Sequence, residues 1–187
     1  MPSTKPLHII AGTAKNRRLI SLPGLATRPL SGRIKKSLFD ILTPVIQGTV
    51  FLDLYAGTGN VGLEALSRGA REAVLVEQST QCLDIIKQNH TNCGFADKAQ
   101  VIGADIINRF THLNKKFDLI FIGPPYKLNL LTQTIKIIDE NDLLAQDGWI
   151  IGQHHFKESL SEKIGRYVMF RQKDYGDSRL SFFRKRG

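Results

Sequence analysis

The stretch TVFLDLYAGTGNVGLEALSRG, residues 49–69, decides the fold. It begins with an apolar run of strand length that contains a single acidic residue, Asp53. Three glycines with the spacing G-x-G-x-x-G then follow, Gly57, Gly59 and Gly62. Glycines in such a loop let the backbone pass close to a ligand, and the helix that starts there has free N–H groups. The stretch therefore predicts a strand, a ligand-binding loop and a helix that ends at Gly69.

The alternation of strand and helix continues along the chain. Further strands are expected in AVLVE, AQVIGA, FDLIFIG and WIIGQHH, with helices between them. Repeated βα units predict a mostly parallel sheet with helices on both faces, which is an α/β fold. The last two apolar runs, YVMFRQKDYG and SRLSFFRKR, predict a terminal hairpin that adds an antiparallel edge to this sheet.

A leading section, residues 1–48, precedes this repeat. Residues 7–22 predict a β-hairpin around a basic turn, and a helix is expected after Ser31 as its N-cap. Length and apolar content predict one domain over residues 1–187, with a leading extension over 1–48 and a ligand-binding core over 49–187.

Positive charge is concentrated in the leading section. The net charge is +9, and no acidic residue occurs before Asp40. Such segregation suits a phosphate backbone, because each cation that contacts it releases condensed counterions; the alternative is a solvated face that only keeps the chain soluble. The candidate nucleic-acid contacts are Arg17, Arg18, Arg28, Arg33, Lys35 and Lys36.

Several classes of protein are not indicated. Asp interrupts the apolar runs well before the roughly 20 residues that span a bilayer, and the first residues lack the apolar core of a secretory signal. Cys82 and Cys93 lack C-x-x-C spacing, so neither a metal site nor a disulfide framework is predicted. We expect a monomer in the reducing cytoplasm that binds no membrane and no metal.

Carboxylates at the strand ends identify the kind of ligand. Glu77 lies about 20 residues after Gly57, where a carboxylate can accept hydrogen bonds from ribose hydroxyls, which would also suit an NAD enzyme. Asp53 opposes that reading, because it would repel a pyrophosphate but attract a sulfonium or an amine. S-adenosylmethionine carries both cations and no phosphate. The alternatives are a buried carboxylate held by backbone N–H groups for Asp53, and a helix N-cap rather than an adenine contact for Asp105.

The stretch FDLIFIGPPYK, residues 117–127, ends a predicted core strand on two prolines and a tyrosine. Pro124 and Pro125 have fixed φ angles and no N–H, so their carbonyl groups can face outward. Beside the proposed cofactor, such a turn can hold an exocyclic amine while the ring of Tyr126 stacks on a flat base. The alternative is a proline-bent loop with a packed tyrosine.

These motifs, together with HIIAGTAKNRRL, TRPLSGRIKKSLFDIL and DYGDSRLSFF, resemble the bacterial RsmD family over nearly the whole chain. The resemblance implies a Rossmann-like methyltransferase fold and methylation of a guanine N2 amine in small-subunit ribosomal RNA, free or in an assembling subunit. It implies that the base stacks on Tyr126, that the ribose binds Glu77 beside Gln78, and that the adenine binds Asp105. The residues that it places around the methionine part are Asp53, Tyr55, Ala56, Gly57 and Gly59.

Two positions depart from the family pattern. The turn is normally Asp-Pro-Pro-Tyr or Asn-Pro-Pro-Tyr, but this chain has Gly123; and Gln153 stands where relatives commonly have Glu. The usual side chain at the first position accepts a hydrogen bond from the target amine. Without it, either the Pro124 carbonyl or a water above Gly123 takes this role in an active enzyme, or the chain binds cofactor and RNA with little turnover. Catalysis by His154 or His155 is not favoured, because one should be packed and the other exposed.

Overall fold

The computed structural model describes residues 7–21, 30–108, 113–126 and 129–187. Twelve helices and strands are assigned in these ranges, and they follow one another in this order: α1 (Gly32–Leu42), β1 (Val50–Leu54), α2 (Gly62–Ser67), β2 (Glu72–Glu77), α3 (Thr80–Asn92), β3 (Ala99–Gly103), β4 (Phe117–Ile122), α4 (Leu130–Glu140), β5 (Leu144–His155), β6 (Lys163–Ile164), β7 (Tyr167–Tyr175) and β8 (Ser178–Lys185).

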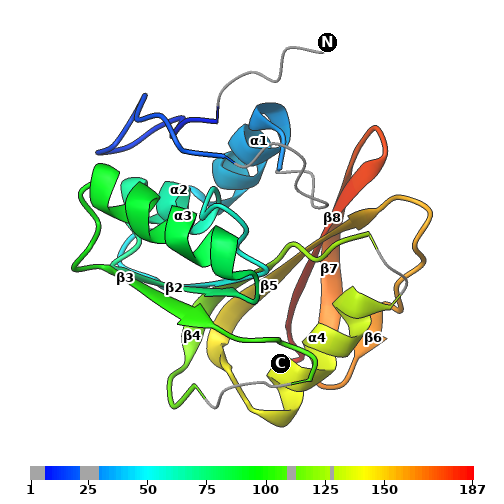
Figure 1. The fold of residues 1–187 in the computed structure, drawn as a ribbon. Coiled ribbons are helices and arrows are strands. Elements are labelled where there is room, and N and C mark those ends of the chain that lie inside the picture. Colours follow the sequence, from blue (N-terminus) through cyan, green and yellow to red (C-terminus); the bar gives the residue numbers. More distant parts are fainter. Residues whose placement is uncertain (1–6, 22–29, 109–112, 127–128) are drawn as a thin grey trace.

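One sheet carries all eight strands in the order β3-β2-β1-β4-β5-β8-β7-β6 (Figure 1). The five strands from β3 to β5 are parallel, and β8, β7 and β6 are each antiparallel to their neighbours. The strand order reverses direction between β1 and β4, where an open α/β sheet binds its ligands at the carboxyl ends of the strands. The predicted α/β class and the antiparallel C-terminal hairpin are therefore confirmed, and β6 is an additional edge strand.

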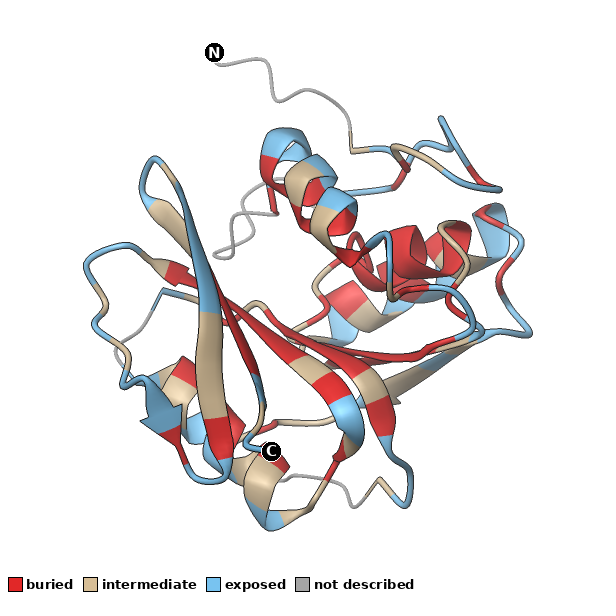
Figure 2. Ribbon diagram, turned by 180° about the vertical axis from the view of Figure 1, so that it is seen from behind, coloured by how far each residue is buried: buried red, intermediate tan, exposed pale blue. Residues whose placement is uncertain are grey.

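Helices cover both faces of the sheet, with α1, α2 and α3 on one face and α4 on the other (Figure 1). Alternate side chains of β1 divide between the two cores: Phe51 packs with α1–α3, whereas Leu52 and Leu54 pack with α4. Figure 2 shows that α2 is buried along its whole length. Because Asp53 has the same parity as Phe51, its side chain lies on the α2 face, where it meets the Gly-rich loop.

The caps predicted from sequence are present. The Ser31 hydroxyl accepts the N–H of Ile34 at the start of α1, and the Ser79 hydroxyl accepts the N–H of Cys82 at the start of α3. Gly69 and Gly94 follow α2 and α3 with positive φ angles of 106° and 75°, as a glycine after a helix C-cap does.

Two local predictions need correction. Residues 7–21 contain one isolated antiparallel bridge, His8 to Arg18, in place of two hairpin strands. This segment is instead held against α2, since the N–H of Thr13 donates to the Ser67 carbonyl at 2.8 Å. The helix expected after Asp105 is a turn over residues 106–108, and its continuation over 109–112 lies outside the described residues.

Candidate active site

The Gly-rich loop between β1 and α2 is held in an unusual backbone conformation. Tyr55 has a φ of 64°, and Gly57 and Gly59 have φ angles of 59° and 79°. Positive φ is costly for a residue with a Cβ, and glycine at positions 57 and 59 avoids this cost. At Gly57 an added Cβ would meet nothing within 4 Å, which leaves open space beside the loop. A ligand can therefore approach the backbone at Gly57.

Glu77 closes this loop onto the end of β2. Its Oε2 accepts the N–H of Gly57 at 2.8 Å, and its Oε1 accepts the N–H groups of Gln78 and Ser79, each at 2.9 Å. Glu77 is half-buried, whereas Gln78 is exposed. Glu77, which the sequence predicts as a ribose contact, positions the loop in this structure, and sequence spacing does not reveal this role.

Asp53 lies under the loop and is almost fully buried, with 1% of its surface exposed. Its Oδ2 accepts the N–H of Gly62 at 2.8 Å. Burial raises the pKa of the Asp53 carboxyl to about 7; the Gly62 hydrogen bond opposes this rise and the charge of Glu77 adds to it. A cation beside Asp53 would restore its ionised form, so the site favours a positively charged ligand.

The other predicted cofactor residues lie along the same edge. Asp105 follows β3 and accepts the N–H groups of Ile107 and Asn108 at 2.9 and 3.1 Å, as a turn-capping residue does. The hydroxyl of Tyr55 is 2.9 Å from that of Thr134 on α4, and Ala56 is buried. Carboxylates thus lie near the carboxyl ends of the adjacent strands β1, β2 and β3. They are acceptors for amine and hydroxyl donors, and they oppose a phosphate.

The Gly-Pro-Pro-Tyr turn follows β4 at the same carboxyl edge. The N–H of Gly123 donates to the Leu54 carbonyl at 3.2 Å, which joins the turn to the end of β1. Pro124 is buried, whereas Tyr126 is 46% exposed. The ring of Tyr126 meets that of His155 edge-on, with centroids 5.9 Å apart. Tyr126 therefore keeps exposed ring surface at the mouth of the site.

Little room remains beside Gly123 itself. A Cβ at this position would lie 2.9 Å from Cε1 of the Phe121 ring and 3.8 Å from Oε1 of Gln153. The ring occupies the place where a side chain would begin, so glycine accommodates Phe121 here. This crowding weighs against a water at the Cβ position of Gly123.

The cations of the leading section do not all face solvent. Arg17, Arg18, Arg33 and Lys36 are exposed, and Lys36 is paired with Asp40 at 2.7 Å. Lys35 is only 2% exposed, so its expected place on the RNA-facing surface is wrong. Arg28 lies outside the described residues.

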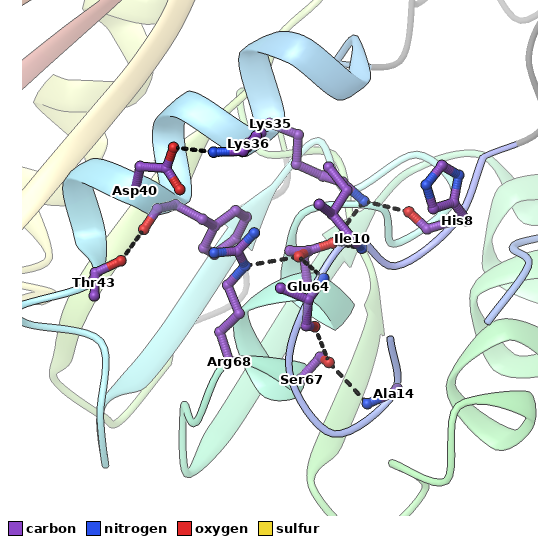
Figure 3. A network of polar contacts seen from close by, with 12 residues as sticks. His8, Ile10, Ala14, Lys35, Lys36, Asp40, Thr43, Glu64, Ser67 and Arg68 are labelled. Atoms are coloured by element: carbon purple, nitrogen blue, oxygen red, sulfur yellow. Dashed lines mark hydrogen bonds and ion pairs between the residues drawn. The ribbon is translucent and has the colours of Figure 1, made fainter. Parts of the chain in front are cut away.

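The amine of Lys35 instead joins the leading section to α2 (Figure 3). Its Nζ is 2.9 Å from Oε2 of Glu64, and it donates to the His8 carbonyl and to Oδ1 of Asn60, each at 2.8 Å. Burial lowers the pKa of Lys35, and the charge of Glu64 opposes this. Burial also disfavours the Glu64 carboxylate, but Lys35 and the hydrogen bonds from Ile10 and Arg68 outweigh it and lower its pKa.

Asn60 and Asn89 make further links from the Gly-rich loop to the leading section. The amide of Asn60 donates to the Leu30 carbonyl at 3.3 Å. The amide of Asn89 donates to the carbonyls of Thr58 and Ile20, and its oxygen accepts the N–H of Ile20 at 2.8 Å. Sequence reasoning missed these residues because asparagine is mostly found on protein surfaces, so neither position stands out as buried. Asn60 had one available signal, its place inside the G-x-G-x-x-G motif.

Of the two histidines of β5, one is packed as expected, whereas the other is half-buried and not exposed. His154 is 1% exposed, with Nδ1 3.0 Å from the His155 carbonyl and Nε2 2.8 Å from the Ser181 hydroxyl. Burial lowers the pKa of His154 and so favours the neutral ring. His155 is half-buried beside Tyr126.

Within the described ranges, no group of three or more His, Cys, Asp or Glu side chains is placed to hold a metal ion. In that same part of the chain, no helix is long and apolar enough to cross a membrane.

Comparisons with known proteins agree with this geometry. Residues 7–184 match the sequence model of a family described as "Conserved hypothetical protein 95". "Putative rRNA methyltransferase YlbH" of Bacillus subtilis is 35% identical over 185 residues, which are 97% of this chain and 100% of that protein. The chain belongs to the RsmD family of methyltransferases. "Ribosomal RNA small subunit methyltransferase D" of Escherichia coli K12 is 29% identical, over 91% of this chain and 85% of that protein.

Solved structures place the RsmD-family fold of this chain among Rossmann-like methyltransferases. The structure of "Putative methyltransferase yhhF" from Escherichia coli has a TM-score of 0.87 at 26% identity, covering 97% of this chain and 98% of that one. An RNA methyltransferase from Salinibacter ruber, solved with S-adenosyl-L-homocysteine, has a TM-score of 0.64 at 15% identity, over 83% and 92% of the two chains. At that identity the second likeness concerns the fold alone.

Proposed function

We propose that this chain transfers a methyl group from S-adenosylmethionine to the exocyclic N2 amine of a guanine in small-subunit ribosomal RNA. One observation carries the proposal. In a chain of a methyltransferase family, the Gly-rich loop and the Gly-Pro-Pro-Tyr turn meet where β1 and β4 lie side by side. We further propose that it acts as a single-domain monomer in the cytoplasm, for which the free thiols of Cys82 and Cys93 are suited.

The cofactor would lie across the ends of β1, β2 and β3. Asp53 and the loop at Tyr55, Gly57 and Gly59 would hold the methionine part, while Glu77 and Asp105 would hold the ribose and the adenine. When bound, S-adenosylmethionine supplies an electrophilic methyl group: the guanine nitrogen bonds to the methyl carbon as the carbon–sulfur bond breaks, the electron pair goes to sulfur, and the surplus proton on nitrogen leaves to water.

The turn after β4 would hold the target base. The exposed ring of Tyr126 would stack on the flat base, and the carbonyl of Pro124 would offer an acceptor to the amine. A guanine amine is a weak nucleophile because its lone pair is delocalised into the ring. The chain's contribution is therefore orientation and hydrogen-bond acceptance at the moment of transfer.

Methyl transfer from labelled S-adenosylmethionine to ribosomal particles that lack the modification tests this proposal. We expect the natural chain to transfer methyl groups. We expect Gly123→Asp to be slower by up to about 100-fold, since the new side chain must displace the Phe121 ring and thereby shifts the turn that orients the base. No transfer by the natural chain, with recovery in Gly123→Asp, would instead support a cofactor- and RNA-binding protein with little turnover.

RNA would dock on the exposed cations of the leading section. We expect the triple variant Arg17→Gln/Arg18→Gln/Arg33→Gln to bind ribosomal RNA more weakly and with a shallower salt dependence. The slope of log K against log salt should fall by about 2–3, since each lost phosphate contact contributes about 0.7–0.9. Filter binding between about 50 and 300 mM KCl measures this slope.

The matched control replaces three exposed lysines outside the leading section, Lys98, Lys136 and Lys163. Equal slopes for the two triple variants would exclude this docking surface.

A further inference from the structure

The space next to Gly123 contains a hydrogen-bond acceptor from another strand. Gln153 lies on β5 and is 8% exposed, and its Oε1 is 3.8 Å from the position that a Cβ of residue 123 would take. Strand pairing accounts for this closeness. Ile122 of β4 is paired with Gly152 of β5, and Gly123 and Gln153 are the next residues after this pair. An amide oxygen therefore lies within van der Waals contact of the Cβ position of residue 123.

A chain of hydrogen bonds orients this amide. Nε2 of Gln153 donates to the hydroxyl of Tyr126 at 3.2 Å, and that hydroxyl is 2.6 Å from the hydroxyl of Ser178 at the start of β8. Since the Tyr126 oxygen accepts from Gln153, its proton is free to go to Ser178. With Nε2 engaged in this way, Oε1 is the end of the amide that faces Gly123.

We propose that Gln153 is a catalytic residue of this chain, whose Oε1 accepts a hydrogen bond from the target guanine amine in place of the side chain that Gly123 lacks. This inference rests on the proposed function. Tyr126 then has two roles, since its ring stacks on the base and its hydroxyl holds the acceptor. Ser178 is a positioning residue that acts through Tyr126. An acceptor aimed at the amine keeps its lone pair directed toward the methyl group as the nitrogen becomes positive.

The kinetic test compares two replacements of Gln153. Gln153→Leu keeps the approximate volume but removes the acceptor, so we expect kcat to fall by about 100- to 1000-fold with the KM values for cofactor and RNA changed little. Gln153→Glu keeps an acceptor, so we expect kcat within about tenfold of the natural chain. Gln88→Leu, on the exposed side of α3, is the matched control. A Gln153→Leu enzyme with kcat within about threefold of the natural value would overturn the proposal.

A binding test does not depend on turnover. Guanosine and inosine monophosphates differ by the N2 amine alone, and their affinities can be measured by NMR titration with S-adenosyl-L-homocysteine present. We expect the natural chain to prefer the guanine nucleotide by about 3- to 10-fold, the worth of one hydrogen bond, and Gln153→Leu to lose the preference. An equal preference in both proteins would overturn the inference. Loss of the preference in a chain that methylates nothing would support the Gln153 contact and reject the proposed activity.

Discussion

Replacing Lys35 by Met is expected to lower the free energy of unfolding by about 3–5 kcal/mol, a large part of the stability of a domain of this size. The substitution removes one of the two cations that contact the buried Glu64 carboxylate, and it leaves the His8 carbonyl and Asn60 without the Lys35 donor. Arg68 still contacts Glu64 at 2.8 Å, which prevents a greater loss. Urea-induced unfolding at pH 7 measures the difference.

Lys36→Met provides the matched control from the next residue of α1. The Lys36–Asp40 pair is solvent-exposed, with side-chain exposures of 64% and 53%, so its loss should cost less than about 1 kcal/mol. The double variant Lys35→Met/Glu64→Gln should regain part of the loss, because glutamine removes the buried carboxylate that lost its lysine but still accepts the N–H of Ile10. If Lys35→Met and Lys36→Met unfold at the same urea concentration, the buried pair does not hold the leading section.

Replacing Asp53 by Asn is expected to weaken binding of S-adenosylmethionine by about 10- to 150-fold at pH 8, since a hydrogen bond to a charged group is worth about 1.5–3 kcal/mol. Without cofactor, the same variant should be more stable than the natural chain at this pH. Because the pKa of Asp53 rises from 3.8 to about 7 on folding, the natural chain loses stability as pH rises through that window. Asparagine does not titrate, so the advantage of the variant should grow from pH 4 to pH 7 and then level off.

Cofactor affinity should show the complementary pH dependence. Below about pH 7 the Asp53 carboxyl is protonated in the free protein, so binding a cation there requires release of that proton. Affinity of the natural chain should then fall by up to about tenfold per pH unit below pH 7, while that of Asp53→Asn stays flat. Calorimetry between about pH 5.5 and 8 measures both. A natural chain whose affinity does not change over this range would show that Asp53 makes no contact with the cation.

Local signals in the sequence were sufficient for most of the fold. The strand-glycine-helix stretch at residues 49–69, the caps Ser31 and Ser79, and the terminal hairpin are all confirmed because each is specified by neighbours in the chain. Residues 7–21 were predicted as two strands because their apolar runs match that period. They form one bridge, because α2 and the side chain of Glu64 satisfy their backbone groups instead.

The sequence by itself determined the α/β class, the glycine-rich loop, the strand-end carboxylates and the anomaly at Gly123. Only the tertiary structure decided which charges face solvent and which groups lie next to the anomaly. Lys35 and Lys36 look alike in sequence. In the structure, Lys35 lies on the buried face of α1 against Glu64, whereas Lys36 lies on the exposed face. Gln153 is thirty residues from Gly123 along the chain, and parallel pairing of β4 with β5 brings its amide oxygen beside the missing side chain. The physical reason is that local propensities act between neighbours in sequence, whereas burial and cross-strand contacts are set by the packing of the whole sheet.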